Sequence, residues 1–234
     1  MLYIMEKTYT GIGTLGEKDL HALLKLHYET DVSKHEQKVG TYVADILNEQ
    51  GIVEIQTRQL HKLRPKLNAF LVEHHVTVVY PIVANKTLAW IDPDTGEVTK
   101  KRRSPKRGQL IDAARELYAL KMYLLDEKLV IHLHFVDVHE TRWLNGWSDD
   151  RKKGSHRANQ EPQLIKECIV LNEPTDYRQF IPVDLSELFT SKDLAQHLKA
   201  PLHKVQTLIN VLHHVGVIQK VDKQGRLNVY RRIL

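Results

Sequence analysis

The sequence predicts an α/β fold in which helices flank a mixed sheet, followed by a small α+β unit at the carboxyl end. Three observations support this prediction. Segments with apolar residues at helical spacing alternate with short β-branched runs. One uninterrupted apolar run, 76–83, has the length of a strand that is buried on both faces. From Asp184 the pattern changes to helices and a terminal hairpin, so we place the boundary within 172–182 and predict domains at 1–178 and 179–234.

The composition is that of a globular chain from a reducing compartment. The 234 residues are 42% hydrophobic and 27% charged, which suits a sizeable core and is too apolar for a disordered chain. The single cysteine, Cys168, excludes a disulfide framework and a zinc motif of paired cysteines. The sequence has neither an apolar run of transmembrane length nor a signal-peptide pattern at its start. We therefore expect a cytoplasmic protein without a membrane partner.

Positive charge is concentrated in two places. The net charge is +5, and from Ile181 onward eight Lys and Arg residues stand against four Asp and Glu, compared with 26 against 25 in the remainder. A second concentration is the segment "KKRRSPKRG", 100–108. Such clusters are typical of surfaces that bind a polyanion, and DNA is the partner we expect.

The first half of the chain predicts a helix and then a hairpin. Apolar residues recur at helical spacing over 13–29, and Thr14 with Glu17 forms a capping box at the start. Two β-branched runs, 39–47 and 51–57, flank the turn signal "NEQG". These segments predict a helix that is followed by two antiparallel strands.

The remaining elements of the first domain alternate in the same way. A second helix is predicted over 60–74, with Pro65 near its start, where proline is tolerated. It leads into the buried strand. Beyond that strand the pattern predicts a hairpin, a helix, a half-buried strand, a polar loop and a final strand, over 87–101, 108–127, 128–138, 145–162 and 167–174.

The predicted hairpin brings two acids together. If "NEQG" closes it with Leu47 opposite Ile52, then Asp45 faces Glu54, and directly opposed residues have Cβ atoms about 4.5–5.5 Å apart. Because side chains alternate along a strand, Gln56 shares the face of Glu54. Two ionised carboxylates at that distance repel each other unless a proton or a cation lies between them. Carboxylate oxygens with a backbone carbonyl are the ligands that Mg²⁺ accepts.

The stretch "YVADIL…GIVEIQT" resembles the PD-(D/E)XK nuclease superfamily. The core of that superfamily is a helix, strands, a helix and a strand, with an Asp on one strand and D/E-x-K on the next. Asp45 matches the first acid, and Glu54-Ile55-Gln56 matches the second motif in its E-x-Q variant. Glu17 matches an acid on the first helix of some members, such as archaeal Holliday-junction resolvases.

The resemblance is good over about 13–82 and continues loosely to 138, and the whole chain also resembles a little-characterised family of bacterial proteins. It implies a restriction-endonuclease-like fold and a deoxyribonuclease that depends on Mg²⁺ or Mn²⁺, in DNA repair, recombination or defence. Asp45, Glu54 and the Ile55 carbonyl would bind the metal, with Glu17 as a further acid. A homodimer is expected because two DNA strands need cutting.

The resemblance leaves open which residue replaces the motif lysine. Gln56 can form hydrogen bonds but adds no positive charge to stabilise a developing negative charge. A cation from the following helix is therefore expected to take this role. Lys66 is preferred, and Lys62 and Arg58 are the competitors.

Plainer interpretations of the same residues stay open. Glu17 could serve only as the capping partner of Thr14, and Asp45 and Glu54 could lie on a solvated face. Gln56 could indicate a catalytic site that has decayed. The alternative function is then a non-catalytic DNA-binding regulator that keeps the nuclease-like scaffold, and a third is an RNA-processing enzyme.

The carboxyl-terminal residues follow a helix-turn-helix pattern and predict a winged-helix domain. Thr190 with Asp193 forms a capping box, Gly216 ends the last helix, and 217–234 forms a hairpin, the wing. The second helix of the motif and the wing supply the residues expected to contact DNA, which are His203, Lys204, Gln206, Thr207, Asn210, Lys223 and Arg226. Winged helices also serve as dimerisation or protein-docking modules.

Two further groups of residues have less specific interpretations. The basic cluster Lys100, Lys101, Arg102 and Arg103 is expected to form a flexible phosphate-binding loop, and a solvated loop is the alternative. His132 and His134 share one strand face but lack zinc spacing to cysteine or carboxylate partners, so they are expected to be structural or surface histidines. Cys168 is expected to pack as a small hydrophobic residue.

Overall fold

The computed structural model describes residues 16–144 and 157–233, with the side chains of 16–18 left out. The main sheet is formed by β1 (His35–Val39), β2 (Tyr42–Asn48), β3 (Gly51–Ile55), β4 (Val76–Ile91), β5 (Arg102–Arg103), β6 (Leu129–Trp143) and β7 (Arg157–Leu171). Its helices are α1 (Gly16–Tyr28), α2 (Arg64–Phe70) and α3 (Ala114–Ala119). Short 3-10 helices are η1 (Val32–Lys34), η2 (Leu60–Leu63), η3 (Leu110–Ala113), η4 (Lys121–Tyr123) and η5 (Pro174–Phe180).

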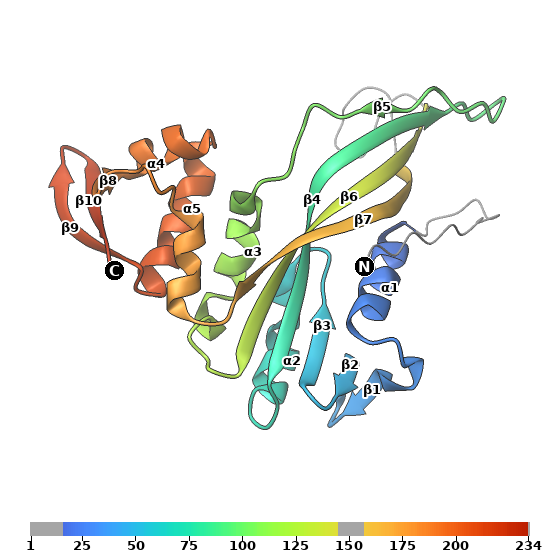
Figure 1. Cartoon of the computed structure of the whole chain (residues 1–234), viewed down its shortest axis with the longest axis horizontal. Coiled ribbons are helices and arrows are strands. Elements are labelled where there is room, and N and C mark those ends of the chain that lie inside the picture. Colours follow the sequence, from blue (N-terminus) through green and yellow to red (C-terminus); the bar gives the residue numbers. More distant parts are fainter. Residues whose placement is uncertain (1–15, 145–156, 234) are drawn as a thin grey trace.

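The main sheet is mixed and has helices on both faces, as Figure 1 shows. Its strand order is β1-β2-β3-β4-β6-β7, and β5 pairs with the outer part of β4. The strand β4 runs parallel to both β3 and β6, whereas the other neighbours are antiparallel. The predicted class, an α/β fold with a mixed sheet flanked by helices, is confirmed at this level.

Two separate hydrophobic clusters cover the two faces of the sheet. On one face Leu20 and Leu24 of α1 pack against Val53, Val79 and Val136. On the other face a larger cluster contains α2, α3 and the inward side chains of β4 and β6. The sheet is therefore a middle layer, and each face buries the apolar side of a helix.

The carboxyl-terminal elements form a second, smaller unit. They are β8 (Leu188–Thr190), α4 (Ser191–Leu198), α5 (Leu202–His214), β9 (Ile218–Gln224) and β10 (Leu227–Arg232). The three strands pair in the order β8-β10-β9. Thr190 caps α4 through a capping box with Asp193, as the sequence predicted.

The second unit shares its core with the main sheet. Leu208 and Leu212 of α5 and Leu117 of α3 are 0% exposed and belong to one hydrophobic cluster. Beside this contact the ammonium of Lys204 forms an ion pair with Asp112. In Figure 1, α5 lies next to α3. The two units therefore pack together through side chains that both of them bury.

Three long strands extend beyond the helices as an arm. Figure 1 shows β4, β6 and β7 running together to one end of the molecule. The arm contains a carboxylate with 0% exposure, Glu140, whose oxygens lie 2.6 Å from Lys86 Nζ and 2.5 Å from Arg142 Nε. Burying a charge is tolerated when it is paired in this way. The strands were predicted to end at 83 and 138. These ends were too early, because polar residues such as Lys86 and Glu140 continue the pairing of β4 with β6.

Several other element predictions were wrong. The helix expected over 108–127 is broken into η3, α3 and η4. Residues 157–162, expected to be a polar loop, form the start of β7, whereas 145–156 lie outside the described residues. The helix expected from Asp184 is absent from the described residues there, and β8 occupies 188–190. Among the described residues, no helix is both long enough and apolar enough to cross a membrane.

Candidate metal and catalytic site between two strands

The hairpin of β2 and β3 has the register that the sequence predicted. Leu47 lies opposite Ile52, and Asn48 lies opposite Gly51. Gly51 has φ +118°, and a Cβ there would lie 2.4 Å from the His75 carbonyl oxygen. Only glycine fits this position without strain, because both its backbone conformation and its close approach to the neighbouring chain exclude a side chain. This glycine fixes the start of β3 and so the position of Glu54, which follows it.

The two acidic residues lie where β2 and β3 separate. The backbone pairing of the two strands extends only as far as Ile46 opposite Val53. Beyond that point Asp45 Oδ2 accepts a hydrogen bond of 2.8 Å from the Ile55 amide. The Asp45 amide in turn lies 3.4 Å from Glu54 Oε1. Each carboxylate therefore accepts a hydrogen bond from the backbone of the opposite strand, which holds the two side chains together in this opening.

The side-chain nitrogen groups around the pair come from helices on opposite faces of the sheet. Lys66 of α2 places its Nζ 3.0 Å and 2.9 Å from the two oxygens of Glu54. His21 Nε2 and Lys25 Nζ of α1 lie 3.2 Å and 3.9 Å from the Asp45 carboxylate. We expected both acids on one patch of a single face, and that was wrong. They meet in the gap between the strands, with a helix on either side.

The surroundings shift the pKa values of the two carboxyl groups in opposite directions. Glu54 is 1% exposed, and its burial together with the negative charge of Asp45 raises the pKa of Glu54 to about 7, although Lys66 acts in the opposite direction. Burial also acts to raise the pKa of Asp45, but hydrogen bonds from His21 and Ile55 outweigh it, and the pKa of Asp45 is lowered. Near neutral pH, Asp45 is ionised while Glu54 is close to its titration midpoint.

The raised pKa of Glu54 predicts how stability depends on pH. The folded state holds this proton up to a pH of about 7, whereas the ordinary glutamate pKa is 4.5. Because the unfolded state loses this proton at a lower pH, the free energy of unfolding falls as the pH rises from 4.5 to 7, by up to about 3 kcal/mol. Urea denaturation without metal measures the free energy of unfolding. That of Glu54→Gln should increase relative to that of wild type as the pH is raised from 5 to 8. The same difference at both pH values would contradict the raised pKa.

The other predicted site residues have different outcomes. The side-chain amide of Gln56 donates a 2.7 Å hydrogen bond to the Arg58 carbonyl, which turns it away from the acids. The side chains of Arg58 and Lys62 are exposed, and Lys66 is the cation that reaches Glu54. Glu17 lies in the first turn of α1, but its side chain is outside the described residues.

The predicted metal ligands have donor chemistry that suits Mg²⁺. The Asp45 and Glu54 carboxylates and the Ile55 carbonyl are hard oxygen donors. The pKa of Glu54 is raised even with Lys66 in contact, so the positive charge around Glu54 does not offset its burial and the charge of Asp45. A divalent cation beside both carboxylates would relieve this repulsion. The residues therefore fit the metal that the sequence predicted.

Two of the four basic residues that were expected in a loop belong to a strand. Arg102 and Arg103 form β5, with the Arg102 guanidinium 4.4 Å from the Trp90 ring centroid and Arg103 bonded to Asn85 at 3.1 Å. The flexible loop that we expected is therefore wrong for these two residues. Lys100 and Lys101 precede β5 and are exposed.

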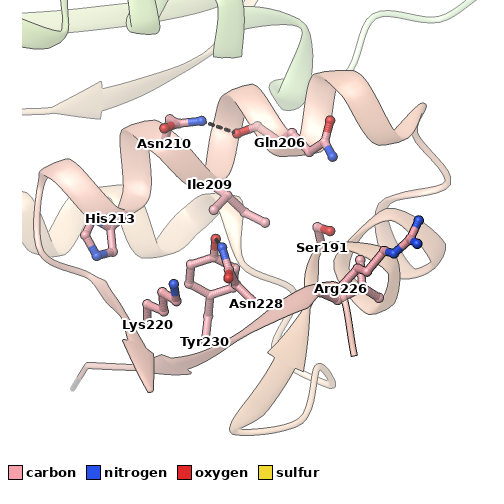
Figure 2. Close-up of a pocket in the computed structure, with 10 residues that line it drawn as sticks. Ser191, Gln206, Ile209, Asn210, His213, Lys220, Arg226, Asn228 and Tyr230 are labelled. Carbon is pink, nitrogen blue, oxygen red and sulfur yellow. Dashed lines mark hydrogen bonds between the residues drawn. The ribbon is translucent and has the colours of Figure 1, made fainter. Parts of the chain in front are cut away.

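The predicted contact residues of the second unit lie on α5 and on the β9–β10 hairpin. His203, Gln206 and Asn210 are exposed. Figure 2 shows Gln206 and Asn210 at a hollow of about 510 Å³ between α5 and the β9–β10 hairpin. Its other polar lining residues include His213, Lys220, Arg226 and Asn228. The hydroxyl of Thr207 bonds back to the His203 carbonyl, and Lys204, whose side chain is 41% exposed, forms an ion pair with Asp112. Lys223 is exposed at the end of the hairpin.

Sequence reasoning missed two groups of residues. His21 and Lys25 contact Asp45, and their spacing of four along one helix face was the signal that could have found them. Cys168 is exposed and lies opposite His134 in the sheet, so the expectation that it packs as a small hydrophobic residue was wrong.

Comparison with known proteins places the sheet and its acids in a family. A family model described as a domain of unknown function, DUF8091, matches residues 18–172. The chain belongs to the DUF8091 family. The matched DUF8091 region spans β1 to β7 and ends just after Leu171, so α4, α5 and the second sheet follow it.

A relative of this DUF8091 chain covers the second unit as well as the matched region. A protein of Treponema pallidum (strain Nichols), described as uncharacterized, is 28% identical over 228 residues, which cover 94% of this chain and 87% of the relative. No solved structure matches the chain significantly.

Proposed function

We propose that this protein is a DNA endonuclease of the PD-(D/E)XK type that depends on Mg²⁺ or Mn²⁺. The observation that carries the proposal is the set of Asp45, Glu54 and Lys66, which meet where β2 and β3 separate. An acid, a second acid and a lysine are the groups that the superfamily motif brings together. Here the lysine comes from α2, which offsets the absence of a lysine at Gln56.

The order of elements supports the same proposal. α1 precedes the antiparallel strands β1, β2 and β3, then α2 leads to β4, which pairs in parallel with β3. This is the sequence of helix, strands, helix and strand that the resemblance implies. It places both acids on neighbouring strands and the lysine on the next helix.

The residues of the opening would divide the work of phosphodiester hydrolysis. A divalent ion held by Asp45, Glu54 and the Ile55 carbonyl would polarise the phosphate and lower the pKa of a bound water. The Lys66 ammonium would stabilise negative charge that develops on the phosphate. His21 and Lys25 keep Asp45 ionised and fix its orientation from the α1 side.

The second unit supports DNA as the substrate. Its helices α4 and α5 with the strand order β8-β10-β9 have the arrangement expected of a winged helix, in which β9 and β10 form the wing. The exposed side chains of His203, Gln206 and Asn210 would approach base edges, and Lys223 and Arg226 would approach phosphates. A cytoplasmic location and a homodimer stay predictions.

Cleavage of DNA is the direct test of this proposal. Purified full-length protein is incubated with supercoiled plasmid and with branched DNA, in Mg²⁺, in Mn²⁺ or in EDTA. We expect nicked or linear product only with a metal. Absence of cleavage in every condition, with DNA binding intact, would instead support the alternative.

The alternative is a DNA-binding regulator that keeps this scaffold without catalysis. Two observations favour it: Lys66 already contacts both oxygens of Glu54, and Gln56 is bonded to the Arg58 carbonyl. In this case Lys66 would serve as a structural counter-ion for a buried acid. Metal binding separates the two functions, because the nuclease needs Mn²⁺ at Asp45 and Glu54 and the regulator does not.

The arm predicts a measurable salt dependence of DNA binding. Replacing both Lys100 and Lys101 by alanine should weaken binding equally for all sequences and reduce the slope of log K against log salt by about 2, if each lysine neutralises one phosphate. Fluorescence anisotropy at several salt concentrations measures the slope. Lys38→Ala, an exposed lysine of β1, is the control. An unchanged slope in the double variant would show that the arm does not contact DNA.

A further inference from the structure

Three side chains with metal-binding atoms gather on one face of the main sheet. His132 and His134 are two positions apart on β6, so they point to the same face. Cys168 of β7 lies directly opposite His134. One ligand atom from each of the three residues lies within 4.8 Å of the other two. The pairing of β6 with β7 thus creates a nitrogen, nitrogen and sulfur set that the linear sequence does not show.

The end of α1 covers this set. The Tyr28 hydroxyl lies 2.6 Å from His132 Nδ1 and 2.6 Å from His134 Nε2. A phenol has one proton, so it donates to one ring and accepts from the other. The ring of His27 lies edge-on to His134, with centroids 5.4 Å apart. Aromatic rings therefore enclose the two histidines from the helix side, and Cys168 remains exposed to solvent.

One atom of the set is buried without a partner. His134 Nδ1 has no hydrogen-bond partner among the described residues, although His134 is only 4% exposed. A buried polar atom of this kind costs free energy unless a ligand satisfies it. A ligand bound at this face would satisfy His134 Nδ1.

We propose that His132, His134 and Cys168 form a Zn²⁺ site, because β6 and β7 hold two imidazoles and one thiol together beneath α1. Zinc binds imidazole nitrogen at about 2.0–2.1 Å and thiolate sulfur at about 2.3 Å, so its ligand atoms lie roughly 3.3–3.8 Å apart. The three ligand atoms lie within 4.8 Å of one another, so their side chains would have to move about 1 Å closer to bind zinc. Water would occupy the fourth coordination position of the zinc, on the solvent-exposed side of the site beside Cys168.

The chemistry of the set selects zinc over magnesium. Imidazole and thiolate are ligands for zinc, whereas Mg²⁺ prefers carboxylate, carbonyl and water oxygens. Binding converts the Cys168 thiol to a thiolate and releases its proton to solvent. The site shares no ligand with Asp45 and Glu54, so its presence does not depend on the proposed nuclease activity.

A cobalt titration of the full-length protein tests the proposal. The chain is purified, stripped with a chelator and titrated with Co²⁺, which replaces zinc and is coloured. We expect one equivalent to bind and to give the near-ultraviolet band of a thiolate bound to cobalt. Adding Zn²⁺ should remove this band. Zinc at 100 times its dissociation constant should raise the melting temperature of the stripped protein by about 5–10 °C.

Two variants distinguish the site from an adventitious one. Cys168→Ser keeps the size of the exposed side chain, so it should fold, lose the thiolate band and bind zinc at least about tenfold more weakly. His75→Ala, an exposed histidine, is the control and should bind as wild type does. The proposal is overturned if wild type binds no stoichiometric zinc, or if Cys168→Ser and wild type give the same spectrum and affinity.

Discussion

Replacing Glu54 by glutamine is expected to abolish metal-dependent DNA cleavage. Glutamine keeps the shape of the side chain but removes the charge that would hold the metal beside Asp45. We expect the cleavage rate to fall by more than about 100-fold, the scale on which loss of one electrostatic group in a catalytic site acts. Mn²⁺ affinity, measured by calorimetry, should fall with it. Plasmid nicking at saturating metal measures the rate.

The control for this variant lies in the same hairpin. Glu49→Gln makes the same chemical change in the exposed turn between β2 and β3. It should cleave DNA as wild type does. Because Glu54 carries the raised pKa, wild-type Mn²⁺ affinity should also rise with pH up to about 7 and then level off. Full activity of Glu54→Gln would exclude the opening as the active site, whatever the fate of the zinc site.

Replacing Leu208 by alanine is expected to destabilise the whole protein. Leu208 is 0% exposed and lies in the cluster that joins α5 to α3. Loss of a buried leucine side chain costs about 2–5 kcal/mol, which corresponds to a fall in melting temperature of roughly 5–15 °C for a chain of this size. Because the core is shared, we expect one calorimetric transition in both wild type and variant.

An exposed leucine supplies the comparison. Leu125→Ala removes the same atoms at a position that is 52% exposed and should change the melting temperature little. Two separate transitions in wild type, with only one moved by Leu208→Ala, would show that the units fold independently. This would favour the predicted boundary at 178 and 179 as a true domain boundary.

The parts of the site that depend on short segments could be predicted from the sequence. The "NEQG" turn fixed Leu47 opposite Ile52, because Asn48 and Gly51 define the turn locally. Lys66 could be preferred because it lies on the helix that follows β3, and that helix must pack back against the sheet near the end of β3. The partners of Asp45 could not be predicted, since His21 lies 24 residues away and reaches it only after α1 packs on the sheet.

Interactions between residues that are far apart in the sequence explain some of the errors in the fold. The arm strands continue past their apolar halves because Glu140 finds Lys86 on another strand, 54 residues away. The strand β1 was missed because "HEQKV" is polar and Glu36 has φ +50°, a conformation that interrupts the strand pattern. The pairing of Cys168 with His134 depends on the register of β7 against β6, which no spacing in the sequence encodes.

The packing of α5 on α3 has a consequence for how the protein would handle a duplex. Leu208 and Leu212 are buried against the main sheet, so no free tether connects the two units. The offset between α5, which we propose contacts DNA, and the opening at Asp45 and Glu54 is then set by how the chain folds. If the proposed activity holds, a duplex bound along α5 would be cut at a constant distance from the bases that α5 contacts.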